Sequence, residues 1–109
     1  FMGNLTTNEK QALTDFRDVL VADFGALDVR LFGSRARGEG DEESDLDVFV
    51  LLPQIDWELE KKIYGLSFDI SLGHAVLISP ILYSQSDIEN PSIMISPLYK
   101  TVQREGVKI

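Results

Sequence analysis

The residues best suited to chemistry lie between positions 33 and 47, which read Gly-Ser-Arg-Ala-Arg-Gly-Glu-Gly-Asp-Glu-Glu-Ser-Asp-Leu-Asp. Asp45 and Asp47 are spaced i, i+2, so both carboxylates point to one face of an extended strand. Gly33 and Ser34 lie upstream, where a turn can offer backbone N–H groups and a hydroxyl to a phosphate. Magnesium prefers carboxylate oxygens, waters and substrate phosphates. The stretch therefore predicts a site for a nucleoside triphosphate held on magnesium.

The reaction class that suits these residues is phosphoryl or nucleotidyl transfer, which depends more on positioning and charge neutralisation than on covalent catalysis. Two magnesium ions about 4 Å apart can stabilise both the attacking and the leaving oxygen. Asp45 and Asp47 are the predicted catalytic residues and metal ligands, and the second metal site is expected to be weak. The predicted nucleotide-binding residues are Gly33, Ser34, Arg35, Arg37 and Ser44.

Hydrophobic periodicity predicts the elements that must position these residues. Thr6 and Glu9 form a capping-box pattern ahead of apolar residues at helical spacing. Pro80 indicates an edge strand and Pro91 a loop. Trp57, at a helix start, is expected to be a packing residue. The expected elements are a helix over 8–23, strands over 27–32 and 45–52, a helix from 56 to 73, a strand over 75–83 and a helix from 96 to 106.

The resulting order, α-β-β-α-β-α, predicts an α/β (α+β) fold with one mixed sheet and helices packed on it. Residues 1–109 are expected to form a single domain. The strand over 45–52 is apolar on both faces except at its first residues, as expected for an internal strand with a site at one end. Leu46, Val48, Val50 and Leu52 face one way, and Asp45, Asp47, Phe49 and Leu51 face the other.

Composition limits the partners. The 109 residues include 10 basic and 18 acidic side chains, a net charge of −8, which argues against nonspecific nucleic-acid binding because that needs a basic face. The balance is compatible with a magnesium-bound nucleotide or a basic protein partner. The absence of cysteine excludes thiolate zinc sites and cysteine nucleophiles and fits a reducing cytoplasm. The longest apolar run, 48–52, is far too short to span a membrane.

The Gly-Ser pair, the ten-residue spacer and the Asp-x-Asp together resemble the signature of the DNA polymerase beta-like nucleotidyltransferase superfamily. The sequence of residues 33–38 and the short length of the chain are similar to those of the minimal nucleotidyltransferases. The resemblance implies that Gly33 and Ser34 hold the β- and γ-phosphates and that Asp45 and Asp47 ligate magnesium. It also implies attack on the α-phosphate of a nucleoside triphosphate, most simply ATP, with pyrophosphate leaving.

Members of this minimal group are often antitoxins paired with a helical HEPN-domain ribonuclease, and some place AMP on a tyrosine of that toxin. The resemblance therefore implies a HEPN-domain partner; homo-oligomers stay open. The family's third carboxylate is missing from the strand over 75–83, where Ser79 stands near its expected position. Asp69 is expected to be solvated, and Asp87 to cap a helix. Three functions follow as alternatives: an active transferase, an antitoxin that masks its partner with little or no catalysis, and a structural domain with a vestigial site.

Overall fold

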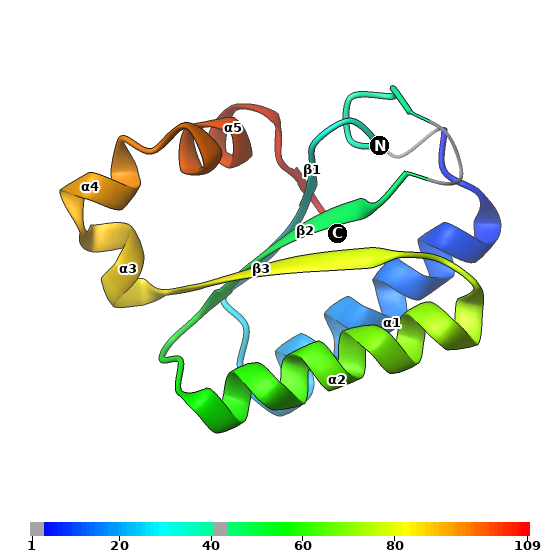
Figure 1. Cartoon of the computed structure of the whole chain (residues 1–109), viewed down its shortest axis with the longest axis horizontal. Helices are drawn as coiled ribbons and strands as arrows, with labels where there is room; N and C mark the ends of the chain where they lie inside the picture. The colour runs from blue at the N-terminus through cyan, green and yellow to red at the C-terminus, as the bar shows by residue number, and fades with distance from the viewer. Residues whose placement is uncertain (1–3, 41–43) are drawn as a thin grey trace.

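The computed structural model describes residues 4–40 and 44–109. A four-stranded mixed sheet forms its centre (Figure 1). The elements are, in chain order, α1 (Thr7–Phe24), β1 (Asp28–Phe32), β2 (Leu46–Leu52), α2 (Trp57–His74), β3 (Ile78–Ser84), α3 (Gln85–Glu89), α4 (Pro91–Met94), α5 (Pro97–Glu105) and β4 (Val107–Lys108).

The strands lie in the order β3-β2-β1-β4. β1 pairs antiparallel with both β2 and β4, and β2 pairs parallel with β3 through the α2 crossover. This confirms the expected mixed α/β sheet. Pro80 lies in β3, an edge strand, as its missing N–H donor predicted.

The two faces of β2 belong to different layers. Leu46, Val48, Val50 and Leu52 are buried in a core shared with α1 and α2, whereas Phe49 packs on the opposite face with Val102 of α5. Figure 1 shows α1 and α2 below the sheet and α5 above it. The predicted alternation is therefore confirmed, and Asp47, which has the same parity as Phe49, lies on the α5 side.

Side chains define the helix ends. In α1 the predicted capping box is present: the Thr6 hydroxyl accepts from the Glu9 N–H at 3.0 Å, and Glu9 Oε1 accepts from the Thr6 N–H at 2.8 Å. Asp56 caps α2 as predicted, with the Leu59 N–H donating to its carboxylate at 2.8 Å. The predicted α5 start at Pro97 and stop at Gly106 are also confirmed.

Three expectations need correction. The C-cap of α2 is Ala75, not Gly73. The last residue of the helix, His74, contacts α1 through its Nε2, which lies 3.0 Å from Asp15 Oδ2. Pro91 is the first residue of α4, where its missing N–H costs nothing, with Asn90 capping the helix. Trp57 is 73% exposed and is not a packing residue of this chain. The short elements α3, α4 and β4 add to the expected order.

Within residues 4–40 and 44–109, the helices are too short or too polar to cross a lipid bilayer.

Candidate functional site

Asp45 and Asp47 lie where β2 begins. Asp45 is exposed and immediately precedes the strand; Asp47 is the second strand residue and is partly buried. Burial, and next the negative charge of Asp45, raise the pKa of Asp47 above its usual value. The Asp45 carboxylate lies close enough to Asp47 to disfavour the ionisation of Asp47, and two neighbouring carboxylates form a ready ligand pair for a cation. The predicted metal ligands are therefore neighbours in space.

Gly33, directly after β1, lies against Asp47. Its backbone adopts φ +81°, and a Cβ at this position would lie 2.5 Å from Asp47 Oδ2. The sheet register explains the approach, because Phe32 is the β1 partner of Asp47. Both the left-handed backbone and the lack of space require glycine here. The glycine predicted to let the backbone approach phosphate thus also makes room for a carboxylate.

A helical turn follows Gly33. The Gly33 carbonyl accepts from the Ala36 and Arg37 N–H groups at 3.1 and 3.2 Å, and the Ser34 carbonyl accepts from the Glu39 N–H at 2.8 Å. Its first two residues, Gly33 and Ser34, are partly exposed at the same edge of the sheet as the two aspartates. We call residues 33–38 the Gly-Ser turn.

Ser34 and Ser44 converge on Gly40. A Cβ on Gly40, whose φ is +75°, would lie 3.3 Å from Ser34 Oγ and 2.8 Å from Ser44 Oγ. Two predicted nucleotide-binding hydroxyls are therefore brought together from opposite ends of the β1–β2 connection. Sequence reasoning missed Gly40, because the pattern does not distinguish it from the nearby Gly38. A Cβ on Gly38 would meet no atom within 4 Å.

Arg35, a predicted phosphate contact, is buried against α1. Its side chain is 2% exposed, and its Nη2 lies 2.7 Å from Oε1 of buried Glu9 on α1. This buried ion pair gives Arg35 a structural role, and its Cδ lies beside the Ser34 and Ser44 hydroxyls around Gly40. Its contact with a phosphate therefore stays a prediction. Its partner Glu9 was predicted only as a helix cap.

Arg37, by contrast, stays accessible at 40% side-chain exposure. Its Nη1 lies 2.8 Å from Glu105 Oε2 of α5, and its Nε lies 3.0 Å from Glu39 Oε2. These surface ion pairs are exchangeable at little cost. Arg37 therefore stays a predicted contact for a phosphate or a partner.

Ser79 occupies the predicted position of the missing acid. It is the register partner of Asp47 on the parallel strand β3, so both side chains lie on the same face of the sheet. Asp69 is exposed on α2, behind the sheet, and Asp87 caps α3 by accepting from the Ser84 N–H at 2.9 Å. Among the residues that the structure describes, no group of three His, Cys, Asp or Glu side chains could hold a metal ion. The acidic residues 41–43, which the sequence pattern indicates as part of a solvated loop, lie outside the described residues.

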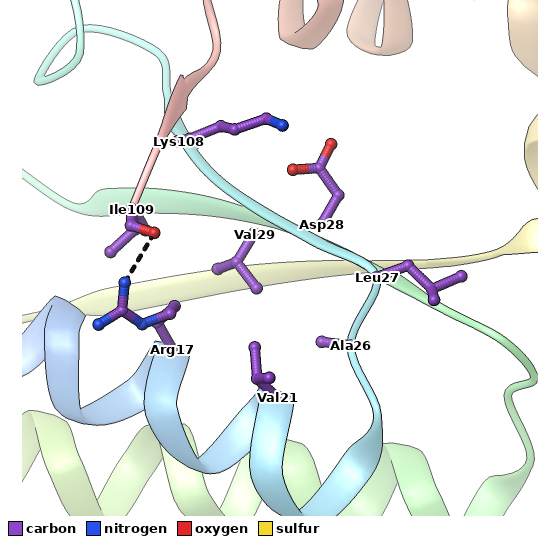
Figure 2. Close-up of a pocket in the computed structure, with 8 residues that line it drawn as sticks. All are labelled: Arg17, Val21, Ala26, Leu27, Asp28, Val29, Lys108 and Ile109. Atoms are coloured by element: carbon purple, nitrogen blue, oxygen red, sulfur yellow. Dashed lines mark hydrogen bonds between the residues drawn. The ribbon is translucent and has the colours of Figure 1, made fainter.

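A separate pocket of about 170 Å³ opens beside α1 and the first residues of β1, at the end of β1 opposite to Gly33 (Figure 2). Arg17 donates there to the Ile109 carbonyl at 3.0 Å. The length of β1 lies between this pocket and the Gly-Ser turn, so the pocket is separate from the candidate site. It is lined by Arg17, Val21, Ala26, Leu27, Asp28, Val29, Lys108 and Ile109.

Comparison with known proteins gives concordant results. The family described as "Nucleotidyltransferase domain" matches residues 13–103. A curated relative from Methanocaldococcus jannaschii, named "Putative protein adenylyltransferase", is 48% identical over 59 residues, which are 53% of this chain. The match spans 60% of the length of that relative.

Solved structures share the fold. One, described as a "putative minimal nucleotidyltransferase", superposes with a TM-score of 0.64 at 26% identity and covers 98% of this chain and 100% of its own. Two variants of a toxin-antitoxin MntA-HpeT each give a TM-score of 0.58 at 18% identity. They cover 96% and 95% of this chain and 72% of theirs, and show likeness of fold alone.

Proposed function

This chain belongs to the nucleotidyltransferase domain family, whose model matches residues 13–103, and from that premise we propose that it transfers a nucleoside monophosphate from a nucleoside triphosphate to a hydroxyl group. The observation that carries the proposal is the contact of Gly33 with Asp47, which brings the Gly-Ser turn against the paired carboxylates. In the transfer, the acceptor oxygen bonds to the α-phosphorus, the bond to the bridging oxygen breaks and pyrophosphate leaves. The hydroxyl proton is lost to solvent or to a carboxylate.

Magnesium suits the donor atoms of this site. Asp45 and Asp47 offer carboxylate oxygens; burial, and next the Asp45 charge, raise the pKa of Asp47, and a bound cation would favour its ionised form. When bound, magnesium would neutralise charge on the phosphates and on the oxygens of the breaking bond. Ser79 adds only a neutral hydroxyl beside Asp47, so a second magnesium would bind weakly.

The other residues of the site bind and orient the two substrates. In the proposal, the N–H groups at the start of the Gly-Ser turn and the Ser34 and Ser44 hydroxyls hold the β- and γ-phosphates. Arg37 exchanges its surface carboxylate partners for phosphate or for an acceptor. Holding both reactants in place converts a bimolecular reaction into one within a complex, and that is the main contribution available to such a site.

We propose ATP as the nucleotide and a protein tyrosine hydroxyl as the acceptor, on a HEPN-domain toxin partner. The relative named as a protein adenylyltransferase supports a protein acceptor, and the fold shared with a toxin-antitoxin protein supports a toxin. The test is incubation with magnesium, α-labelled ATP and the product of the adjacent reading frame. Transfer of label to that protein by the wild type and by Asp23→Asn, an exposed control, but not by Asp47→Asn, is the expected result.

A second function is favoured by one observation, the serine rather than an acid beside Asp47. With weak catalysis, the chain would neutralise a toxin by covering it. The Asp45→Asn/Asp47→Asn double variant separates the two functions. Neutralisation that survives in this variant supports covering, and its loss with binding intact supports catalysis.

A further inference from the structure

Helix α2 is apolar on two opposite sides. Its inner side packs into the core through Ile63, which is fully buried, with Leu59, Leu66 and Ile70 partly buried beside it. Its outer side carries Trp57, Tyr64, Phe68 and Leu72, with exposed fractions of 73%, 48%, 62% and 68%. These positions follow i, i+7, i+11 and i+15, which places them on one stripe of a helix with 3.6 residues per turn.

We call these four residues the outer stripe. Single exposed apolar residues are ordinary, but four exposed apolar residues on one side of a helix, three of them aromatic, favour an interaction surface, with the exposed Lys61 lying among them. None of the four is needed for the core that the structure describes. The outer stripe is therefore apolar for a reason outside the single chain.

Gly65 lies beside the stripe, in the middle of α2. A Cβ on this residue would meet no atom within 4 Å, so the chain's own packing does not require glycine. Glycine in a helix interior costs roughly 1 kcal/mol relative to alanine. A second helix lying close against this position explains the glycine, because the missing side chain lets two backbones approach.

We propose that the outer stripe packs against the same stripe of a second copy, with the two α2 helices antiparallel about a two-fold axis near Gly65. Lys61 and Asp69 are both exposed and lie four residues before and after Gly65. The two-fold axis therefore sets Lys61 of each copy opposite Asp69 of the other. This is the self-complementarity that a two-fold interface needs.

The position of α2 distinguishes a second copy from an acceptor protein. α2 covers the sheet face that carries Leu46 and Val48, whereas Asp47 lies on the face covered by α5. A hydroxyl acceptor must reach Asp47, so its docking surface belongs on the other side of the sheet; this step rests on the proposed function. Pairing through α2 leaves both candidate sites open and facing outward. The exposed stripe and the Lys61–Asp69 complementarity do not depend on the proposed function.

Charge and area set the expected affinity. The chain carries −8 overall, but on α2 Glu58, Glu60 and Asp69 are nearly balanced by Lys61 and Lys62. Aromatic side chains bury about 150–250 Å² each when fully covered, so the three half-covered rings bring about 225–375 Å² per copy, and Leu72 adds a smaller apolar area. This lies below the roughly 800 Å² per partner of a standard interface, so we expect a dimer in the micromolar range.

The chain contains no cysteine, so one introduced thiol reports only on contact between copies. Gly65→Cys should give a disulfide-linked dimer on mild oxidation, whereas Lys100→Cys, an exposed position on α5, should remain largely monomeric. Sedimentation from about 1 to about 100 μM should show the wild type passing from monomer to dimer. Phe68→Glu should weaken association at least tenfold, and Ile95→Glu, at a residue 68% exposed elsewhere, should not.

A charge exchange tests the orientation. Lys61→Glu should weaken association, and Lys61→Glu combined with Asp69→Lys should restore it. A monomeric wild type at every concentration would overturn the proposal, as would equal cross-linking of the two cysteine variants. A dimer that Phe68→Glu leaves intact would place the interface elsewhere and overturn it too. Circular dichroism confirms in each case that the variant is folded.

Discussion

Glu9 and Arg35 form a buried ion pair across 26 positions of sequence, with 2.7 Å between Glu9 Oε1 and Arg35 Nη2. The same Glu9 oxygen accepts from the Thr6 N–H at 2.8 Å. One carboxylate therefore caps α1 and holds the Gly-Ser turn. The start of α1 and the Gly-Ser turn are therefore held together by one side chain.

Removing the Glu9 charge should destabilise the fold severely, because it breaks a buried ion pair in which the Glu9 carboxylate lies 2.7 Å from the Arg35 guanidinium. Glu9→Gln should lower the free energy of unfolding by about 3–5 kcal/mol in urea denaturation. Glu58→Gln, at an exposed α2 position, should change it little. An equal effect of the two variants would contradict a structural role for the pair.

The stability that Glu9 contributes should depend on pH in a known direction. Burial alone would raise its pKa, but hydrogen bonds from Arg35 and Thr6 and the Arg35 charge lower it below the usual value. A lowered native pKa contributes stability above the unfolded-state pKa, and this is lost as pH falls through the native one. The difference in unfolding free energy between wild type and Glu9→Gln should therefore shrink as pH falls from neutral into the acid range.

Gly33→Ala should damage the site more than its backbone strain explains. Gly33 and Gly38 have φ of +81° and +80°, so alanine at either costs about 1–2 kcal/mol. Only at Gly33 does the new Cβ meet Asp47, at 2.5 Å. We expect similar melting temperatures for the two variants, but roughly 100-fold lower transfer for Gly33→Ala alone, because a displacement near 1 Å can cost that much. Equal activities would show that the Gly33–Asp47 contact does not matter.

Asp47→Asn should stabilise the magnesium-free protein. The raised pKa of Asp47 means that its ionised form is disfavoured in the folded state, so its contribution to stability falls as pH rises through the window above the unfolded-state pKa. At neutral pH in a chelator, Asp47→Asn should melt higher than wild type, and below that window the difference should vanish. Magnesium–ATP should then raise the melting temperature of wild type only. A variant that melts lower in the chelator would contradict this account.

Ser79→Asp should strengthen metal binding, because its carboxylate would join Asp47 on the same face of adjacent strands. We expect half-maximal transfer at a lower magnesium concentration than in wild type, with Ser79→Asn as the matched uncharged control. Without magnesium, Ser79→Asp should melt lower than Ser79→Asn, because a third negative charge is added beside two others. An unchanged magnesium requirement would remove Ser79 from the site.

Much of this fold could be predicted because the relevant signals are local. The alternation of side chains along β2 separates Leu46 and Val48 from Phe49. It therefore predicts that Asp47 lies on the same face of the sheet as Phe49. The Thr6–Glu9 capping box lies within one helical turn. The resemblance to the family places Ser79 where the third carboxylate is expected, and the parallel register sets it beside Asp47.

What could not be predicted depends on contacts distant in sequence or on alternatives with the same local pattern. An arginine next to a Gly-Ser pair favours a phosphate contact, and only the folded chain brings Glu9 to Arg35. Proline is common both in loops and at the first turn of helices, so Pro91 fits either. Trp57 belongs to a stripe on the outer side of α2, which apolar character alone does not distinguish from the inner side.

Transfer from differently labelled ATP tests directly whether nucleotidyl transfer takes place at this site. With magnesium and the adjacent gene product, we predict that label from the α-phosphate becomes covalently attached to the acceptor while label from the γ-phosphate leaves as pyrophosphate. Asp47→Asn should abolish the attachment and Asp23→Asn should retain it. Attachment of γ-label, or attachment of α-label that Asp45→Asn/Asp47→Asn leaves undiminished, would contradict nucleotidyl transfer at this site.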